Sequence, residues 1–305
     1  MTTGAVAQNS PVIAIEEHWT FPPLIKALEE LPPERVDPSL VLNNYGGAGL
    51  KLDDLGEARL ADMDAQGVDV QVLALAPPGS QGLAAADAVV VSREANDVVA
   101  EAGRAHPDRF RALASLPLAD PLAAAVELER AANQGLVGTM VYGRDGDTAL
   151  DDPRFEDLWT VAAEMHLPVF IHPQVPSASV RGAAFSGLGD AIDLALSTYG
   201  WGRHLEAGTS ALRLMARGVL DRHPSLQLVL GHWGELLLFW HQRADGVARA
   251  AGLQRSISEY LQQNVWITAS GMLDSAQLQH ALAVTSLDRI LSPPTTLSGR
   301  PTGPT

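Results

Sequence analysis

Apolar runs of strand length alternate with amphipathic stretches of helical length along almost the whole chain. Eight runs have strand character: Val12–Ile15, Val68–Leu75, Phe110–Leu116, Val137–Val141, Pro168–Ile171, Leu226–Leu230, Val265–Thr268 and Arg289–Leu291. Helical patterns lie between most of them: Glu57–Gln66, Asp87–Ala105, Pro121–Gln134, Phe155–His166, Thr209–Arg222, Glu235–Ala250 and Asp274–Ala283. Near-continuous apolar strands are typical of a parallel sheet that is buried on both faces. The alternation therefore predicts an α/β protein with the architecture of a (β/α)₈ TIM barrel.

An open doubly wound sheet is the alternative architecture. Such a sheet commonly carries a Gly-rich phosphate loop after its first strand, and no such loop follows Val12–Ile15. We expect a flexible lead-in over residues 1–11 and one barrel domain over residues 12–291. Asp87 and Asp274 are residues of a type that caps helix N-termini, and both are predicted to do so.

Two segments between these elements are longer than ordinary loops. They are Asn43–Lys51, which follows the first strand, and Gln174–Arg203, which follows the fifth. In a barrel both would lie at the C-terminal ends of strands, where substrates bind. We expect them to form lids or walls of a pocket.

The composition excludes several partners and kinds of site. The 305 residues include 36 Asp+Glu and 21 Lys+Arg, a formal net charge of −15 that disfavours nucleic acids and anionic membranes as partners. The absence of cysteine excludes disulfides, thiolate metal sites and Cys nucleophiles. Neither a secretory signal nor a transmembrane stretch is recognisable, and we expect a cytoplasmic location.

Polar side chains at the ends of two predicted strands form a donor set for a metal ion. Glu16 and His18 follow the first strand and share one of its faces, because side chains alternate along a strand. His172 closes the fifth strand, immediately before Pro173. A carboxylate and two imidazoles are suitable ligands for one divalent ion. The structural alternatives are a surface carboxylate pair and a core histidine with satisfied hydrogen bonds.

A third polar cluster, Gly231–Glu235, follows the sixth strand. Its glycines permit a close approach of the backbone to a ligand. His232 is a candidate metal ligand or general acid/base, and Glu235 could orient it. A turn in which the histidine only caps the next helix is the alternative. His204, near the long segment Gln174–Arg203, is a weaker candidate for the same pocket.

In their order and spacing, these motifs resemble the metal-dependent decarboxylase branch of the amidohydrolase superfamily. That branch includes γ-resorcylate, 2,3-dihydroxybenzoate and aminocarboxymuconate-semialdehyde decarboxylases. The resemblance extends from Val12 to about Leu291, nearly the whole chain. The motifs that carry it are Ile15–His18, Arg59–Asp69, Ala95–Asp97, Pro107–Phe110, Phe170–Pro173, Ala211–Met215, Gly231–Glu235 and Asp288–Leu291.

The resemblance implies a (β/α)₈ barrel with one divalent metal ion, Zn²⁺ or Mn²⁺. It implies that Glu16, His18 and His172 are the metal ligands. It also implies that His232 and Glu235 are catalytic residues, with His232 as the catalytic histidine, hydrogen-bonded near Glu235.

Further residues are expected around the substrate. Arg243, eight residues after Glu235, corresponds to an arginine that lies near the substrate in the family. Trp19 and Trp201 are candidate aromatic walls of the pocket. The partners that the resemblance implies are a small carboxylic acid and further copies of the chain, in a homodimer or homotetramer.

The chain departs from the family pattern after the eighth predicted strand. The family continues with a phrase like Phe-Ser-Thr-Asp-Tyr-Pro-Phe, whose Asp binds the metal and handles the proton, whereas no Asp or Glu follows Asp288 here. The codons CTG TTC TCC ACC GAC TAC CC encode Leu-Phe-Ser-Thr-Asp-Tyr-Pro, and deletion of one T yields CTG TCT CCA CCG ACT ACC. The shifted codons encode the residues observed from Leu291 to Thr296. We infer a frameshift that leaves residues 292–305 as an aberrant irregular tail, truncates the eighth strand and its helices, and weakens metal binding and activity.

The resemblance implies non-oxidative decarboxylation of a small aromatic or unsaturated carboxylic acid. Metal-dependent hydrolysis of an amide, lactone or ester would use similar ligands and remains open. An inactive pseudoenzyme is a third interpretation, and the missing Asp is its main support.

Overall fold

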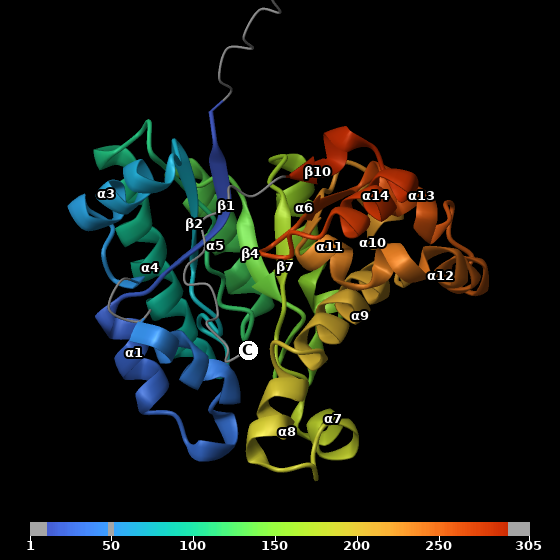
Figure 1. Ribbon diagram of the computed structural model, residues 1–305, viewed down its shortest axis with the longest axis horizontal. Coiled ribbons are helices and arrows are strands. Elements are labelled where there is room, and N and C mark those ends of the chain that lie inside the picture. The colour runs from blue at the N-terminus through green and yellow to red at the C-terminus, as the bar shows by residue number, and fades with distance from the viewer. Residues whose placement is uncertain (1–10, 48–51, 292–305) are drawn as a thin grey trace, which may run out of the picture.

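The computed structural model describes residues 11–47 and 52–291. Eight parallel strands form a (β/α)₈ barrel in the order β1, β2, β3, β4, β7, β8, β9 and β10 (Figure 1). Their bounds are Ile13–Trp19, Val70–Leu75, Phe110–Ala112, Thr139–Tyr142, Val169–His172, Leu228–Leu230, Val265–Thr268 and Ile290–Leu291. A parallel bridge between Ala114 and Thr139 joins the part from β1 to β3 to the part from β4 to β10. The predicted fold class is confirmed, and each predicted strand overlaps an observed one.

Helices surround the strands (Figure 1). In the described residues they are α1 Pro22–Glu29, α3 Glu57–Gln66, α4 Ala85–Ala105, α5 Pro121–Asn133, α6 Glu156–Glu164, α7 Ala178–Ala184, α8 Asp190–Ser197, α9 Gly202–Ala216, α10 Val219–Arg222, α11 His232–Glu235, α12 Leu237–Ala251, α13 Ile257–Gln263 and α14 Ser275–Val284. Short 3-10 helices are η1 Pro33–Arg35, η2 Pro38–Gly47, η3 Pro153–Phe155 and η4 Leu287–Arg289, and β5 Arg144–Asp145 pairs with β6 Thr148–Ala149.

The two predicted helix caps have different outcomes. Asp274 is the N-cap of α14 and accepts a hydrogen bond from the backbone N–H of Ala276, as predicted. The prediction for Asp87 is wrong, because α4 starts after Ala84 and Asp87 lies inside the first turn. An acidic residue there still interacts favourably with the positive end of the helix dipole.

The long segment after the fifth barrel strand is more ordered than an irregular lid. It contains α7 and α8, which lie with α1 at one end of the barrel (Figure 1). The predicted helix Thr209–Arg222 is instead two helices, because α9 starts earlier and Gly218, with φ 74°, separates it from α10. Part of Asn43–Lys51, most of the predicted lead-in and the whole predicted tail lie outside the described residues.

The interior of the barrel is apolar below the functional end. Ala74, Leu113, Met140, Phe170 and Val229 form a cluster of buried side chains inside the strands. A larger core lies between the strands and the helices and includes fully buried Met63, Phe110, Trp159 and Tyr260. Across residues 11–47 and 52–291, no helix has the length and apolarity needed to cross a membrane.

Candidate metal centre

The end of β1 brings a carboxylate and an imidazole to the barrel interior. The register of β1 against β2 shifts between Ala14 and Glu17, and His18 then pairs with Ala74, a member of the interior cluster. Glu17, between the two candidate ligands, instead accepts a hydrogen bond from Gln71. Because side chains alternate beyond the irregularity, Glu16 and His18 both face inward.

His172, the last residue of β7, meets these two side chains. One ligand atom of each of Glu16, His18 and His172 lies within 4.8 Å of the others. The Nε2 atom of His172 is 3.4 Å from Oε1 of Glu16, and the rings of His18 and His172 are 5.1 Å apart in an edge-on arrangement. Nδ1 of His172 lies 2.8 Å from the Pro173 carbonyl and donates to it, and Nε2 is the nitrogen that faces Glu16. The three side chains that were singled out from the sequence therefore converge.

The protonation states of Glu16 and His18 suit the binding of a divalent metal ion. Burial, together with the nearby His172, lowers the pKa of His18 to about 4, so its ring is neutral at physiological pH. Burial alone would raise the pKa of Glu16, but the hydrogen bond with His172 and the neighbouring histidines hold it well below its usual range. Nδ1 of His18 is buried and has no hydrogen-bond partner among the described residues. An ionised carboxylate, a neutral imidazole and an orphaned buried nitrogen fit a divalent ion.

Ser270, which follows β9, completes the surroundings of Glu16. Its hydroxyl donates to Oε2 of Glu16 and also contacts the hydroxyl of Thr268. Ser270 has a φ of 41°, a left-handed conformation that is uncommon for a residue other than glycine. A hydrogen bond of this kind fixes the orientation of a ligand carboxylate. Nothing local in the sequence distinguishes Ser270 from a loop serine, and it was not predicted.

A second cluster joins Glu235 to two histidines. Oε1 of Glu235 is 2.7 Å from Nδ1 of His232, and Oε2 is 3.0 Å from Nδ1 of His204. The two imidazole rings lie 4.3 Å apart, and the side chain of Glu235 has no exposed surface. Nε2 of His204 lies 3.1 Å from the carbonyl of Tyr199. The predicted pair of His232 and Glu235 is present, and His204, the weaker candidate, is its third member.

Electrostatic coupling polarises this cluster. Burial opposes the charge on His232, but its hydrogen bond with Glu235 and the charges of Glu235 and Glu16 raise the pKa of His232 above its ordinary value. Burial also opposes the charge on Glu235, but the hydrogen bonds with His204 and His232 lower its pKa. A buried carboxylate thus stabilises a histidine that carries its proton at higher pH than a free histidine would.

The backbone that carries His232 and Glu235 is a left-handed turn. The φ angles from His232 to Leu236 are 47°, 58°, 81°, 50° and 71°. Left-handed conformations at non-glycine residues are costly and persist only where the surroundings impose them. Helix α9 packs closely against this turn, since a Cβ atom added to Gly208 of α9 would lie 2.3 Å from the carbonyl oxygen of Glu235. The predicted helix Glu235–Ala250 therefore begins at Leu237, after this turn.

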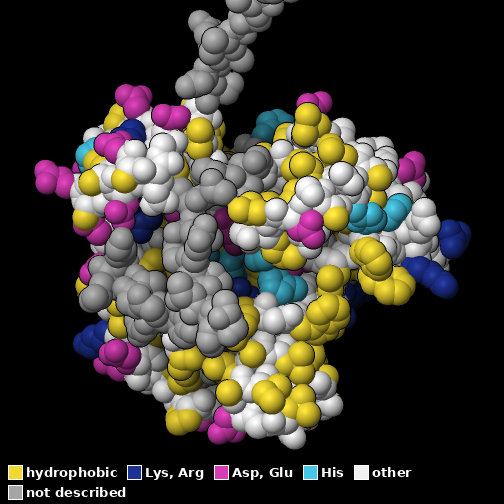
Figure 2. Space-filling model, in the orientation of Figure 1, with side chains coloured by type: hydrophobic (Ala, Val, Ile, Leu, Met, Phe, Trp, Pro, Cys, Tyr) yellow, Lys and Arg dark blue, Asp and Glu magenta, His cyan; other side chains and the backbone are white. Residues whose placement is uncertain are grey.

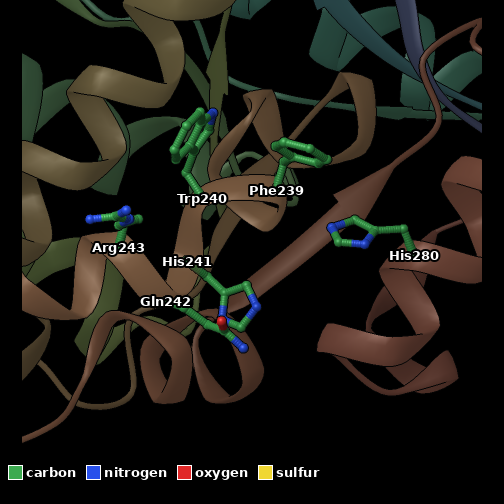
Figure 3. Close-up of a pocket in the computed structure, with 6 residues that line it drawn as sticks. All are labelled: Phe239, Trp240, His241, Gln242, Arg243 and His280. Carbon is green, nitrogen blue, oxygen red and sulfur yellow. The ribbon is translucent and has the colours of Figure 1, made fainter.

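The three residues expected around the substrate, Trp19, Trp201 and Arg243, do not lie together. Trp19 is 1% exposed and packs against Phe21, so the structure places it in the core rather than on a pocket wall. Trp201 is 47% exposed and precedes α9. Arg243 lines an open pocket of about 280 Å³ with Phe239, Trp240, His241, Gln242 and His280, where it points away from His280 (Figure 3). The structure does not bring Arg243 into either histidine cluster.

The surface above the two clusters is hollowed. Figure 2 shows histidine side chains gathered in a central depression, with apolar side chains on the flank formed near α7 and α8. Concave sites with a few convergent polar groups are the usual form of small-molecule sites.

Comparison with known proteins gives a consistent assignment. The model of a family described as amidohydrolase matches residues 15–291. A γ-resorcylate decarboxylase of Rhizobium sp. is 33% identical over 293 residues, which cover 92% of this chain and 85% of that protein. The 5-carboxyvanillate decarboxylase of Sphingomonas paucimobilis is 32% identical, with a TM-score of 0.83 and coverage of 92% of this chain and 87% of the other. The enzyme of that name from Novosphingobium aromaticivorans, solved with manganese and 4-hydroxy-3-methoxy-5-nitrobenzoic acid, is 28% identical, with a TM-score of 0.85 and coverage of 94% and 86%.

Proposed function

Because this chain belongs to the amidohydrolase family, in its metal-dependent decarboxylase branch, we propose that it is a non-oxidative decarboxylase of a small aromatic carboxylic acid. The observation that carries the proposal is the convergence of Glu16, His18 and His172 beside the pair of His232 and Glu235. Similarity to γ-resorcylate and 5-carboxyvanillate decarboxylases supports an aromatic acid as the substrate.

In this proposal Glu16, His18 and His172 hold one divalent ion, manganese or zinc. Two imidazoles and a carboxylate suit either ion, and relatives have been solved with manganese. When bound, the ion supplies positive charge and Lewis acidity to the oxygen atoms of the substrate. Ser270 keeps the Glu16 carboxylate oriented, and the Pro173 carbonyl fixes the tautomer of His172.

We assign to His232 the role of proton donor to the substrate. Decarboxylation breaks the bond between the ring carbon and its carboxylate, releases CO₂ and requires that a proton arrive at that carbon. Glu235 accepts the hydrogen bond from Nδ1 of His232, which leaves Nε2 to donate toward the substrate. The raised pKa of His232 keeps that proton available near neutral pH. His204 holds the second oxygen of Glu235 and so fixes the carboxylate.

The test measures CO₂ release from γ-resorcylate, salicylate and 5-carboxyvanillate by protein loaded with manganese or zinc, beside a panel of lactones, amides and esters. We expect CO₂ from at least one hydroxylated aromatic acid and no hydrolysis. Hydrolysis of a lactone, amide or ester without CO₂ release would replace the proposal with the hydrolase alternative.

The sequence after Asp288 favours a second candidate, an impaired or inactive enzyme. It contains no carboxylate, and the family's Asp would correspond to Thr295, outside the described residues. We propose that replacement of residues 292–305 by a continuation containing Asp strengthens metal binding and raises activity. Equal metal content and equal activity in the two forms would contradict this. Resequencing of the gene across residues 288–305 tests the frameshift directly.

We also propose that the chain assembles as a homodimer or homotetramer. The exposed aromatic side chains of Phe239 and Trp240, 72% and 55% accessible, support this proposal. Analytical ultracentrifugation tests it, and a monomer at micromolar concentration would contradict it.

A further inference from the structure

Arg203 lies in the first turn of α9, and its charge acts on His18 of one histidine cluster and on His232 of the other. Helix α9 contacts both β7, which ends in His172, and α11, which contains His232 and Glu235. The residue next to Arg203, His204, is bonded to Glu235 at 3.0 Å. The start of the helix is fixed, because a Cβ atom on Gly202 would lie 2.7 Å from the carbonyl oxygen of Ser197.

The side chain of Arg203 is a cation without a partner in the described part of the chain. Its Nε atom is buried and makes no hydrogen bond there. Three carboxylates act on Arg203, and each is bonded elsewhere: Glu16 to His172, Glu235 to His204 and His232, and Asp37 to Ser39. A buried N–H donor that lacks an acceptor is costly. By contrast, Arg144 is satisfied by Glu206 and two carbonyls.

The positive charge of Arg203 contributes a local positive potential in a protein whose net charge is −15. Glu16 and Glu235 both act electrostatically on Arg203, although burial lowers the pKa of its guanidinium. With a divalent ion on Glu16, His18 and His172, the mouth of the barrel becomes a local positive focus. A planar guanidinium matches a carboxylate through two parallel N–H donors.

We propose that Arg203 binds the carboxylate of the substrate and thereby sets the preference of the site for aromatic acids over phenols that lack a carboxylate. The inference rests on the proposed function and adds a substrate-binding residue that the sequence motifs did not indicate. Arg203 is adjacent to His204 of the second cluster, whereas Arg243 lines a separate pocket.

The experiment measures the affinity of manganese-loaded protein for 2,6-dihydroxybenzoate and for resorcinol by isothermal titration calorimetry. Arg203→Gln is expected to lower the affinity for the acid by roughly 10- to 100-fold and to leave the affinity for resorcinol within about twofold. Arg203→Lys, which keeps the charge without the planar fork, is expected to lie between. Arg249→Gln, which alters an exposed arginine of α12, is the control and is expected to match the wild type.

Unchanged affinity for the acid in Arg203→Gln, or equal losses for the acid and for resorcinol, would overturn the inference. Circular dichroism shows whether Arg203→Gln folds. If it does not fold, a wild-type affinity of Arg203→Lys for the acid would overturn the inference. If the wild type binds the acid through Arg203 but releases no CO₂, the proposed activity fails and this inference stands. If the wild type releases CO₂ and Arg203→Gln binds the acid as the wild type does, this inference alone fails.

Discussion

At the scale of single residues, the chemistry of the site comes from environments rather than from residue types. His18 and His232 are both partly buried histidines, yet the pKa of His18 is lowered to about 4 and that of His232 is raised. The difference lies in their neighbours, since His232 bonds to the buried Glu235 while His18 lies edge-on to His172. One histidine is thereby suited to donate a lone pair and the other to donate a proton.

Glu235→Gln removes the charge that stabilises protonated His232 while conserving the size of the side chain. Because Glu235 raises the pKa of His232, its loss lowers that pKa and shifts to lower pH the alkaline limb of the rate profile, where His232 loses its proton. We expect the decarboxylation rate near neutral pH to fall by roughly 10²- to 10⁴-fold. Kinetics from pH 5 to 9 and NMR titration of His232 measure both effects. Glu164→Gln, at an exposed position of α6, is the control, and a wild-type pH profile in Glu235→Gln would refute the assigned role.

Ser270→Ala removes the hydroxyl that donates to Glu16. Loss of a group that orients a metal ligand commonly lowers metal affinity by about 10- to 100-fold, and we expect a loss in that range for manganese. Competition with a chelating dye measures the affinity. Ser179→Ala, at an exposed position of α7, should bind as the wild type does. A normal manganese affinity in Ser270→Ala would show that the hydroxyl does not support Glu16.

At the scale of elements, the left-handed turn from His232 to Leu236 holds the proton-handling pair in place. The turn contacts α9, whose Gly208 leaves room for the carbonyl of Glu235. Strand β8 ends at Leu230, and Gly231 leads directly into the turn. The strained backbone is therefore maintained by tertiary packing, in keeping with its position at a functional site.

Gly208→Ala tests this packing. A methyl group 2.3 Å from a backbone oxygen cannot be accommodated without movement of α9 or of the turn. We expect a destabilisation of about 1–3 kcal/mol in urea-induced unfolding, together with reduced activity. Gly103→Ala in α4 meets no atom within 4 Å and is expected to stabilise the protein by about 0.5–1 kcal/mol. Equal changes in the two variants would contradict the close approach.

The same elements show what the sequence can and cannot predict. Strands such as Val169–His172 were predictable because burial on both faces requires a continuous apolar run, and the strand ends then located Glu16, His18 and His172. The turn at His232 was not predictable, because contacts with α9 impose its left-handed backbone on residues that do not favour it. His204 was only a weaker candidate, singled out by its place beside the segment Gln174–Arg203, and nothing local distinguishes Arg203. The packing of α9 brings His204 to Glu235.

At the scale of the whole molecule, ion pairs connect helices that lie far apart in the sequence. Glu156 of α6 accepts hydrogen bonds from Nε and Nη2 of Arg222 at 2.7 and 2.8 Å and lies 2.9 Å from Nε2 of His223. The Arg222 guanidinium and the His223 ring hold the pKa of Glu156 at about 2, against a burial effect that would raise it.

Glu156→Gln is expected to destabilise the protein in a pH-dependent way. Because the folded-state pKa of Glu156 is depressed, its contribution is present above the ordinary pKa near 4.5 and is lost as the pH falls toward 2. The difference between variant and wild type in the free energy of unfolding should therefore be larger at pH 7 than at pH 3. Urea unfolding at both values measures it, with Glu164→Gln as the control. A difference that does not change with pH would contradict the assigned ion pair.

The central claim is that Glu16, His18 and His172 hold one divalent ion at the end of the barrel. Its most direct test is the manganese content and affinity of the wild type, His18→Ala and His172→Ala, measured by inductively coupled plasma mass spectrometry and equilibrium dialysis, with His166→Ala as the control. We predict that the wild type and the control bind one manganese ion per chain and that the other two variants lose binding. Equal binding by all four proteins, or no binding by any of them, would contradict the claim.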